Sequence, residues 1–210
     1  MASRKIEDRD QLNEVLKESF RLVDQKILHA SGTFEIYRGD SFQGMLNDPS
    51  QALLVAVLIR ARLRAWDYAN ADDAKPLPML PDARIGIGVG SVRYKAHKTI
   101  ESDGEAFQNS GQVLDAMKNS GAELAVRTPW EEVNEELEVS CKLLDALINR
   151  WSSAMAEAVY MHLLEDITQQ DLSLKLSISQ PAVHKRLASA NIDAVEACIN
   201  RFQKLITNHV

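Results

Sequence analysis

The chain has 210 residues, of which 45% are hydrophobic and 26% are charged, and its formal net charge is −6 at pH 7. This balance is typical of a globular protein with a real core, and it excludes a general attraction to nucleic acid or to anionic membranes. Any binding of DNA would therefore have to come from a local patch. The longest apolar run, ALLVAVLI at residues 52–59, is too short to cross a bilayer.

The first third of the chain predicts a helix, a β-hairpin and a second helix. Apolar residues recur at helical spacing over residues 8–28. Two short strands at residues 33–37 and 41–46 flank a Gly-Asp pair, which indicates a tight turn. A helix over residues 49–68 begins with a capping aspartate and a proline, both of which are favoured at a helix start.

Two arginines of this second helix, Arg60 and Arg64, are four residues apart and share one helical face. They could form a patch that binds an anion. A solvated helix face is the simpler interpretation, and we favour it.

A glycine-rich strand is predicted at residues 84–92, RIGIGVGSV, where apolar residues alternate with Gly86, Gly88 and Gly90. Glycine weakens a strand and is tolerated where a ligand, a helix or another backbone comes close. The glycine face could therefore meet a nucleotide, but close helix packing or a dimer contact is the favoured interpretation. The spacing does not match a dinucleotide-binding motif, which requires a turn into a helix.

The next elements are a helix over residues 104–118, a strand over residues 122–127 and an acidic helix that extends to about residue 152. Thr128 and Glu131 are predicted to form a capping box at the start of the acidic helix. Its glutamates are interpreted as a solvated face near a helix N-terminus, where negative charge is favourable. Everything after this helix has helical periodicity.

A helix-turn-helix is predicted in the last quarter of the chain. Thr168 can cap a short helix, Ser179 can cap the next one, and a tight turn separates the two. Motifs of this kind usually have glycine at the turn position that Ser177 occupies, and a left-handed conformation costs a non-glycine residue about 1 kcal/mol. The spacing of the whole unit nevertheless fits.

If this motif docks as others do, its second helix enters the major groove of DNA. Gln180, His184 and Lys185 would then face base edges or phosphates. The DNA backbone would be contacted by four further residues, namely Thr168, Gln169, Ser179 and Arg186. The alternative is a three-helix packing module that never touches DNA, since residues 153–210 carry five Lys/Arg against six Asp/Glu and form no basic domain.

Four segments in order, SRKIEDR, GDSFQG, RIGIGVG and DGEAFQNSG, followed by the helix-turn-helix, resemble the bacterial SatD family over nearly the whole chain. Members of that family are commonly described as transcriptional regulators. The resemblance therefore implies a regulator that binds DNA.

The N-terminal part also resembles the class III nucleotidyl cyclase domains, which implies a ferredoxin-like antiparallel sheet with helices on one face. Asp40 matches the metal-binding aspartate of their hairpin. We favour the alternative, in which Asp40 is a turn residue that bonds its own backbone. The first strand of that fold would precede SRKIEDR, so either the sequence starts after this strand or the domain lacks it. Gln108 and Gln112 stand where cyclases use an asparagine and an arginine, so we expect no cyclase activity.

We therefore expect an α+β cyclase-like domain at residues 1–128, a linking helix at 129–152 and a helix-turn-helix domain at 153–210. The expected function is a DNA-binding regulator, not an enzyme, that acts as a cytoplasmic homodimer and senses a small molecule or nucleotide. Asp40, Gly86, Gly88 and Gly90 are the candidate ligand-binding residues. The alternatives are a catalytically inactive nucleotide-binding domain with a C-terminal protein-interaction module, and a purely structural module.

Neither a cofactor nor a metal is expected. The five histidines are scattered and lack ligand spacing. Cys141 and Cys198 lie in helical sequence, outside any CxxC motif, and are predicted to be reduced core thiols. Double-stranded DNA is the expected partner, and a membrane is not.

Overall fold

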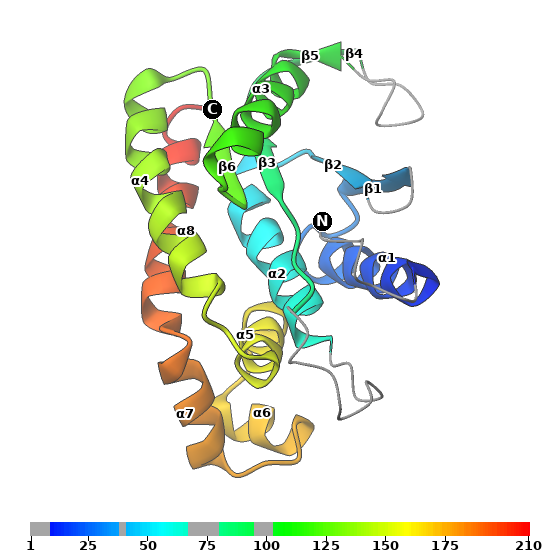
Figure 1. Cartoon of the computed structure of the whole chain (residues 1–210), viewed down its shortest axis with the longest axis vertical. Coiled ribbons are helices and arrows are strands. Elements are labelled where there is room, and N and C mark those ends of the chain that lie inside the picture. The colour runs from blue at the N-terminus through cyan, green and yellow to red at the C-terminus, as the bar shows by residue number, and fades with distance from the viewer. Residues whose placement is uncertain (1–8, 38–40, 67–79, 95–102) are drawn as a thin grey trace.

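The computed structural model describes residues 9–37, 41–66, 80–94 and 103–210. In these ranges the chain is mostly helical, and its strands form three separate two-stranded sheets (Figure 1). The predicted α+β class is confirmed at this level. A single ferredoxin-like sheet is not shown, because the described strands do not join into one sheet.

The predicted first helix and hairpin are confirmed. Helix α1 spans Arg9–Lys26, and strands β1 (Gly32–Tyr37) and β2 (Ser41–Leu46) pair in antiparallel register. Phe20 of α1 stacks on Phe34 of β1 with ring centroids 4.8 Å apart. The hairpin thus packs on α1 through apolar side chains.

Helix α2 (Ala52–Ala65) runs through the middle of the molecule (Figure 1). It follows a short 3-10 turn, η2 (Pro49–Gln51), where the carboxylate of Asp48 accepts a hydrogen bond from the backbone N–H of Ser50 at 2.9 Å. Most of its residues are buried, as expected for a helix that is apolar around its whole circumference. Helices α1 and α5 pack on it.

The glycine-rich strand β3 (Ile85–Gly88) pairs in parallel with β6 (Leu124–Arg127). Helix α3 (Glu105–Ser120) connects the two and packs on both, which is the usual arrangement for a parallel pair. A small antiparallel pair, β4 (Val92–Tyr94) with β5 (Asp103–Gly104), precedes α3.

Helix α4 (Glu131–Ile148) begins where the sequence predicts, but its expected capping box is wrong. Trp130 occupies the cap position and makes no side-chain cap bond. The Thr128 hydroxyl instead accepts from the Trp130 N–H at 3.1 Å and donates to the Asn134 side chain at 2.9 Å. Asn134 therefore takes the place that the prediction gave to Glu131, and it closes the turn between β6 and α4.

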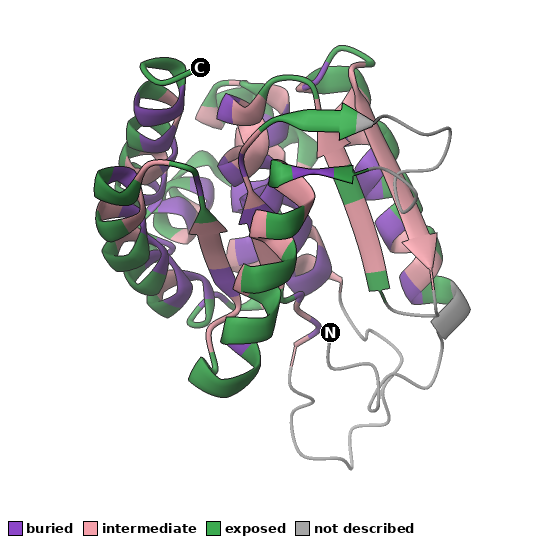
Figure 2. Ribbon diagram, turned by 90° about the horizontal axis from the view of Figure 1, so that it is seen from above, coloured by how far each residue is buried: buried purple, intermediate pink, exposed green. Residues whose placement is uncertain are grey.

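Four helices complete the chain, α5 (Ser153–Glu165), α6 (Gln169–Lys175), α7 (Gln180–Ser189) and α8 (Ile192–Thr207). Buried hydrophobic residues from Leu12 to Ile206 form one connected core, and Figure 2 shows buried segments on the inward faces of the helices. The division at residues 128 and 152 stays a prediction. In the described ranges, every helix is too short or too polar to cross a membrane.

Candidate functional site

Helices α6 and α7 contact each other and are joined by a short turn, over the residues where the sequence predicts two capped helices. The Thr168 hydroxyl accepts from the Asp171 N–H at 3.2 Å, and the Ser179 hydroxyl accepts from the Ala182 N–H at 3.4 Å. Both predicted caps are therefore confirmed. The apolar positions of the two helices are buried or packed against the core, namely Leu172, Leu176, Ile178, Val183 and Leu187.

The turn between α6 and α7 depends on a left-handed residue. Ser177 has φ of 53°, and it occupies the position where helix-turn-helix motifs usually have glycine. We therefore expect Ser177→Gly to raise the free energy of unfolding by about 0.5–1 kcal/mol, because glycine adopts this conformation without the Cβ penalty. Urea unfolding followed by circular dichroism would measure the change, and an unchanged or lower midpoint would contradict it.

The residues predicted to face DNA lie mostly on the exposed side of this unit. Gln180, His184 and Lys185 are exposed on α7, and the first two are four residues apart on one helical face. Thr168 and Ser179 are exposed at the two caps, and Gln169 is half-buried. Arg186 is different, because its Nη1 donates to Glu157 Oε2 at 3.0 Å.

Ion pairs reduce the positive charge that this region offers. Besides Arg186, Lys175 contacts Glu165 at 2.9 Å and Arg201 contacts Glu136 at 2.6 Å. Lys185 and Lys204 form no ion pair with any residue in the described ranges. Lys185 is therefore the cation of α7 that is most available to a phosphate.

A cleft of about 840 Å³ lies between the β1–β2 hairpin on one side and β3 with α3 on the other. Helix α2 forms part of its lining, as do Trp130 and His209. Gly86, Gly88 and Gly90 all border this cleft. Asp40, the fourth candidate ligand-binding residue, lies outside the described residues.

The glycines of β3 also lie very close to α3. A Cβ added to Gly88 would lie 2.1 Å from the carbonyl oxygen of Ala106, and one added to Gly86 would lie 2.5 Å from Val113 Cγ1. The close helix packing that the sequence favoured is thus present. It accounts for why these two positions hold glycine, whatever the cleft binds.

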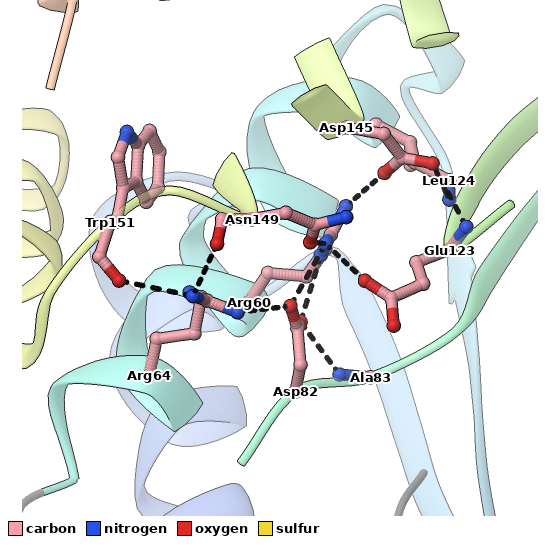
Figure 3. Close-up of polar contacts among 9 residues, drawn as sticks. All are labelled: Arg60, Arg64, Asp82, Ala83, Glu123, Leu124, Asp145, Asn149 and Trp151. Atoms are coloured by element: carbon pink, nitrogen blue, oxygen red, sulfur yellow. Dashed lines mark hydrogen bonds and ion pairs between the residues drawn. The ribbon is translucent and has the colours of Figure 1, made fainter. Parts of the chain in front are cut away.

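Arg60 is fully buried at the centre of an ion-pair cluster (Figure 3), so the predicted solvated helix face is wrong. Its Nε and Nη2 donate to the two carboxylate oxygens of Asp82 at 2.8 and 2.9 Å. Nη2 also donates to Glu123 and to the side chain of Asn149, at 3.0 and 2.9 Å, and Nη1 donates to Asp145. A buried guanidinium needs this many acceptors because water cannot supply them.

The second arginine extends the cluster to the start of the C-terminal helices. Arg64 Nη1 donates to Asp82 at 2.9 Å, and its Nη2 donates to the backbone carbonyls of Asn149 and Trp151, each at 3.0 Å. Asp145 accepts from the backbone N–H groups of Glu123 and Leu124 at 2.9 and 3.0 Å. The cluster therefore ties α2 to β6, α4 and the α4–α5 connection.

The charges of this cluster shift the pKa values of its members. Burial alone would lower the pKa of Arg60, but the hydrogen bonds and charges of Asp82 and Asp145 outweigh it and raise that pKa. Burial, followed by repulsion from Asp82, raises the pKa of Glu123 above its usual value. Three carboxylates face two guanidinium groups, and Glu123 is the most exposed of the three. The cluster thus joins α2 to distant parts of the chain through buried ion pairs.

Sequence reasoning missed this cluster although a signal was present. Arg60 and Arg64 interrupt a segment that is otherwise apolar on every side. Such a helix is buried, and a charge on a buried helix requires acidic partners elsewhere in the chain. The partners could not be chosen from the many carboxylates available.

Among the described residues, neither the thiols nor the possible metal ligands form a second site. Cys141 is buried, and burial raises the pKa of its thiol to about 12, with a smaller contribution from Cys198. Both cysteines are free thiols. Within the part of the chain that the structure describes, no three His, Cys, Asp or Glu side chains are placed to hold a metal ion.

Comparison with known proteins gives one match, a family model described as the SatD family, which covers residues 1–203. No curated protein and no solved structure matches the chain.

Proposed function

The chain belongs to the SatD family, and we propose that it is a DNA-binding transcriptional regulator. The observation that carries the proposal is the α6–α7 unit, with both caps made, a left-handed turn residue between them, and an exposed α7 that presents Gln180, His184 and Lys185. Glutamine can pair with adenine, and lysine with guanine or phosphate, in the major groove. In this proposal Thr168, Gln169 and Ser179 contact the DNA backbone.

The protein acts as a homodimer in this proposal. One short recognition helix with a single unpaired lysine gives weak and poorly selective binding. Two copies that read paired half-sites correct this weakness. The N-terminal part would then supply dimer contacts and the site for an effector, for which the cleft beside β3 offers space.

The test is fluorescence anisotropy with DNA fragments from around the protein's own gene, at several salt concentrations. We expect affinity to fall with salt, with a logarithmic slope of about −0.9 for each phosphate contact. Lys185→Ala should make that slope shallower by about 1, and Gln180→Ala should weaken binding to the best fragment by about 1–3 kcal/mol.

Lys204→Ala is the matched control, because Lys204 is exposed and without an ion pair in the described chain but lies on α8. It should bind DNA as the wild type does. A folded protein that binds no fragment at low salt would refute the regulator. The alternative, an inactive nucleotide-binding domain with a C-terminal protein-interaction module, would then be the function to test.

A further inference from the structure

One face of helix α4 is exposed and carries two large apolar side chains. Val139 and Leu143 are 60% and 64% exposed, and because they are four residues apart they are neighbours on the helix surface. Among the described residues, they are the only large apolar pair on one helix of which each member is more than half exposed. Ala146 is exposed three residues beyond Leu143. Helix α4 packs on β6 and α8 through its buried residues, so this apolar patch faces outwards.

Charged residues of opposite sign lie at the two ends of the patch. Glu132 lies seven residues before Val139 and Arg150 lies seven residues after Leu143, and both are exposed on the same face of the chain's path through α4. Among the residues that the structure describes, Arg150 makes no ion pair, and the one ion pair of Glu132 is with His209 at 3.6 Å. These positions form what we call the α4 stripe, namely Glu132, Val139, Leu143, Ala146 and Arg150.

The α4 stripe is complementary to itself when two copies meet in antiparallel orientation. A two-fold axis midway between Val139 and Leu143 places each of them opposite the other in the second copy, so that apolar side chains meet at the centre. Because Glu132 and Arg150 are equally far from that axis along the helix, each glutamate comes opposite the arginine of the other copy. A parallel arrangement would instead place glutamate near glutamate. The charges therefore favour a second, antiparallel copy of α4 as the occupant of this face.

The described chain leaves the α4 stripe uncovered, and the segments outside the described ranges are poor candidates to cover it. Helix α4 lies at the left edge of Figure 1, whereas α1, the β1–β2 hairpin and the β4–β5 pair, to which residues 1–8, 38–40 and 95–102 are joined, lie on the right. Residues 67–79 start nearer to α4, because Ser153 Oγ donates to the carbonyl of Ala65 at 3.1 Å. They contain three aspartates and one lysine, and this negative charge opposes the glutamates of α4.

We propose that the α4 stripe is the main contact of a homodimer, in which α4 packs antiparallel on α4 of a second copy about a two-fold axis. The inference rests on the proposed function for the need of a dimer, and the N-terminal part adds contacts around the same axis. A contact made mainly by one helix from each copy is at the small end of specific interfaces, below about 1,200 Å² in total. The dimer should therefore dissociate in the micromolar range, at about 1–100 µM.

Sedimentation velocity of the full chain without DNA, over a range of concentrations, measures the dimer independently of DNA binding. Leu143→Glu should raise the dissociation constant at least about ten-fold, because it places a carboxylate in the apolar centre of the contact. Leu174→Glu is the matched control, since Leu174 is 71% exposed on α6, and it should dimerise as the wild type does. Circular dichroism of both variants checks that they are folded.

Charge reversal tests the register of the two helices. Glu132→Arg and Arg150→Glu each place like charges opposite one another at both ends of the contact, so each variant alone should dimerise at least about ten-fold more weakly than the wild type. An equimolar mixture of the two, with only one of them fluorescently labelled, has opposite charges at both ends again and should form a heterodimer. The two residues are about 27 Å apart on one helix, too far to contact each other within a chain, so only two copies can give this result.

The proposal is overturned if the wild type remains monomeric at about 500 µM, which would assign the stripe to a segment of the same chain or to another protein. It is also overturned if Leu143→Glu dimerises as tightly as the wild type. Failure of the two charge-reversed variants to associate in the mixture, while the wild type dimerises, would mean that the dimer uses another surface or register. A wild type that dimerises as expected but binds no DNA would refute the regulator and support the dimer.

Discussion

Replacement of Arg60 by leucine should lower the free energy of unfolding by about 3–5 kcal/mol. Arg60 is fully buried and donates to Asp82, Asp145 and Glu123. Without the guanidinium, these carboxylates remain close together with less charge to balance them. Leucine also fills less of the space than arginine does. Urea unfolding at pH 7 would measure the loss.

Arg62→Leu is the matched control for this substitution. Arg62 lies on the same helix, two residues away, but it is only half-buried and its guanidinium carbon lies 5.8 Å from the centre of the Tyr160 ring. Its replacement should cost at most about 1 kcal/mol, since a cation–π contact of this kind contributes about 0.5–1 kcal/mol at exposed sites. Equal losses for the two variants would contradict the role assigned to the cluster.

Non-additivity gives a sharper version of this test. Asp145→Asn alone should also be strongly destabilising, because Arg60 loses a charged acceptor and the amide cannot replace both carboxylate oxygens. In the double variant, Arg60→Leu with Asp145→Asn, the loss should be smaller than the sum of the two single losses, by 0.5–3 kcal/mol. Strict additivity would mean that the two residues act independently despite their contact.

The contrast between the caps of α6 and α7 and the Arg60 cluster shows what the sequence could predict. The caps at Thr168 and Ser179 act on N–H groups three residues away, so the local sequence contains both partners. Arg60 instead meets partners that are 22, 63 and 85 residues distant. Local spacing carries no information about such pairs, and only the fold brings them together.

The cleft could not be predicted for a different reason. The sequence indicated β1 and β2 with nearly correct bounds, whereas the strand predicted at residues 84–92 is shorter and ends at Gly88. It also singled out Gly86, Gly88 and Gly90. However, strand pairing depends on which edges meet, and the alternation of side chains does not encode it. The parallel pairing of β3 with β6, and the space left beside it, arise from how α2 and α3 pack.

A second large effect is expected at Trp151, where Trp151→Ala should lower the free energy of unfolding by about 3–5 kcal/mol. The indole is 2% exposed, its Nε1 donates to the carbonyl of Ala190 at 3.0 Å, and the Trp151 carbonyl accepts from Arg64 Nη2 at 3.0 Å. One residue thus joins the end of α7 to α2. The alanine variant would lose the packed ring and leave the Ala190 carbonyl without its donor.

Trp151→Phe separates these two contributions, because it keeps an aromatic ring but removes the N–H. We expect it to cost less than the alanine variant, about 1–3 kcal/mol, which is the cost of leaving a buried acceptor unpaired. Guanidinium unfolding of both variants would measure the difference. Trp130→Ala is the control, because Trp130 is only partly buried and contacts His209 with ring centroids 4.8 Å apart. A Phe variant as unstable as the Ala variant would assign the whole effect to the hydrogen bond with Ala190. A Phe variant as stable as the wild type would assign it to packing, and the contact of Trp151 with the end of α7 would then be apolar.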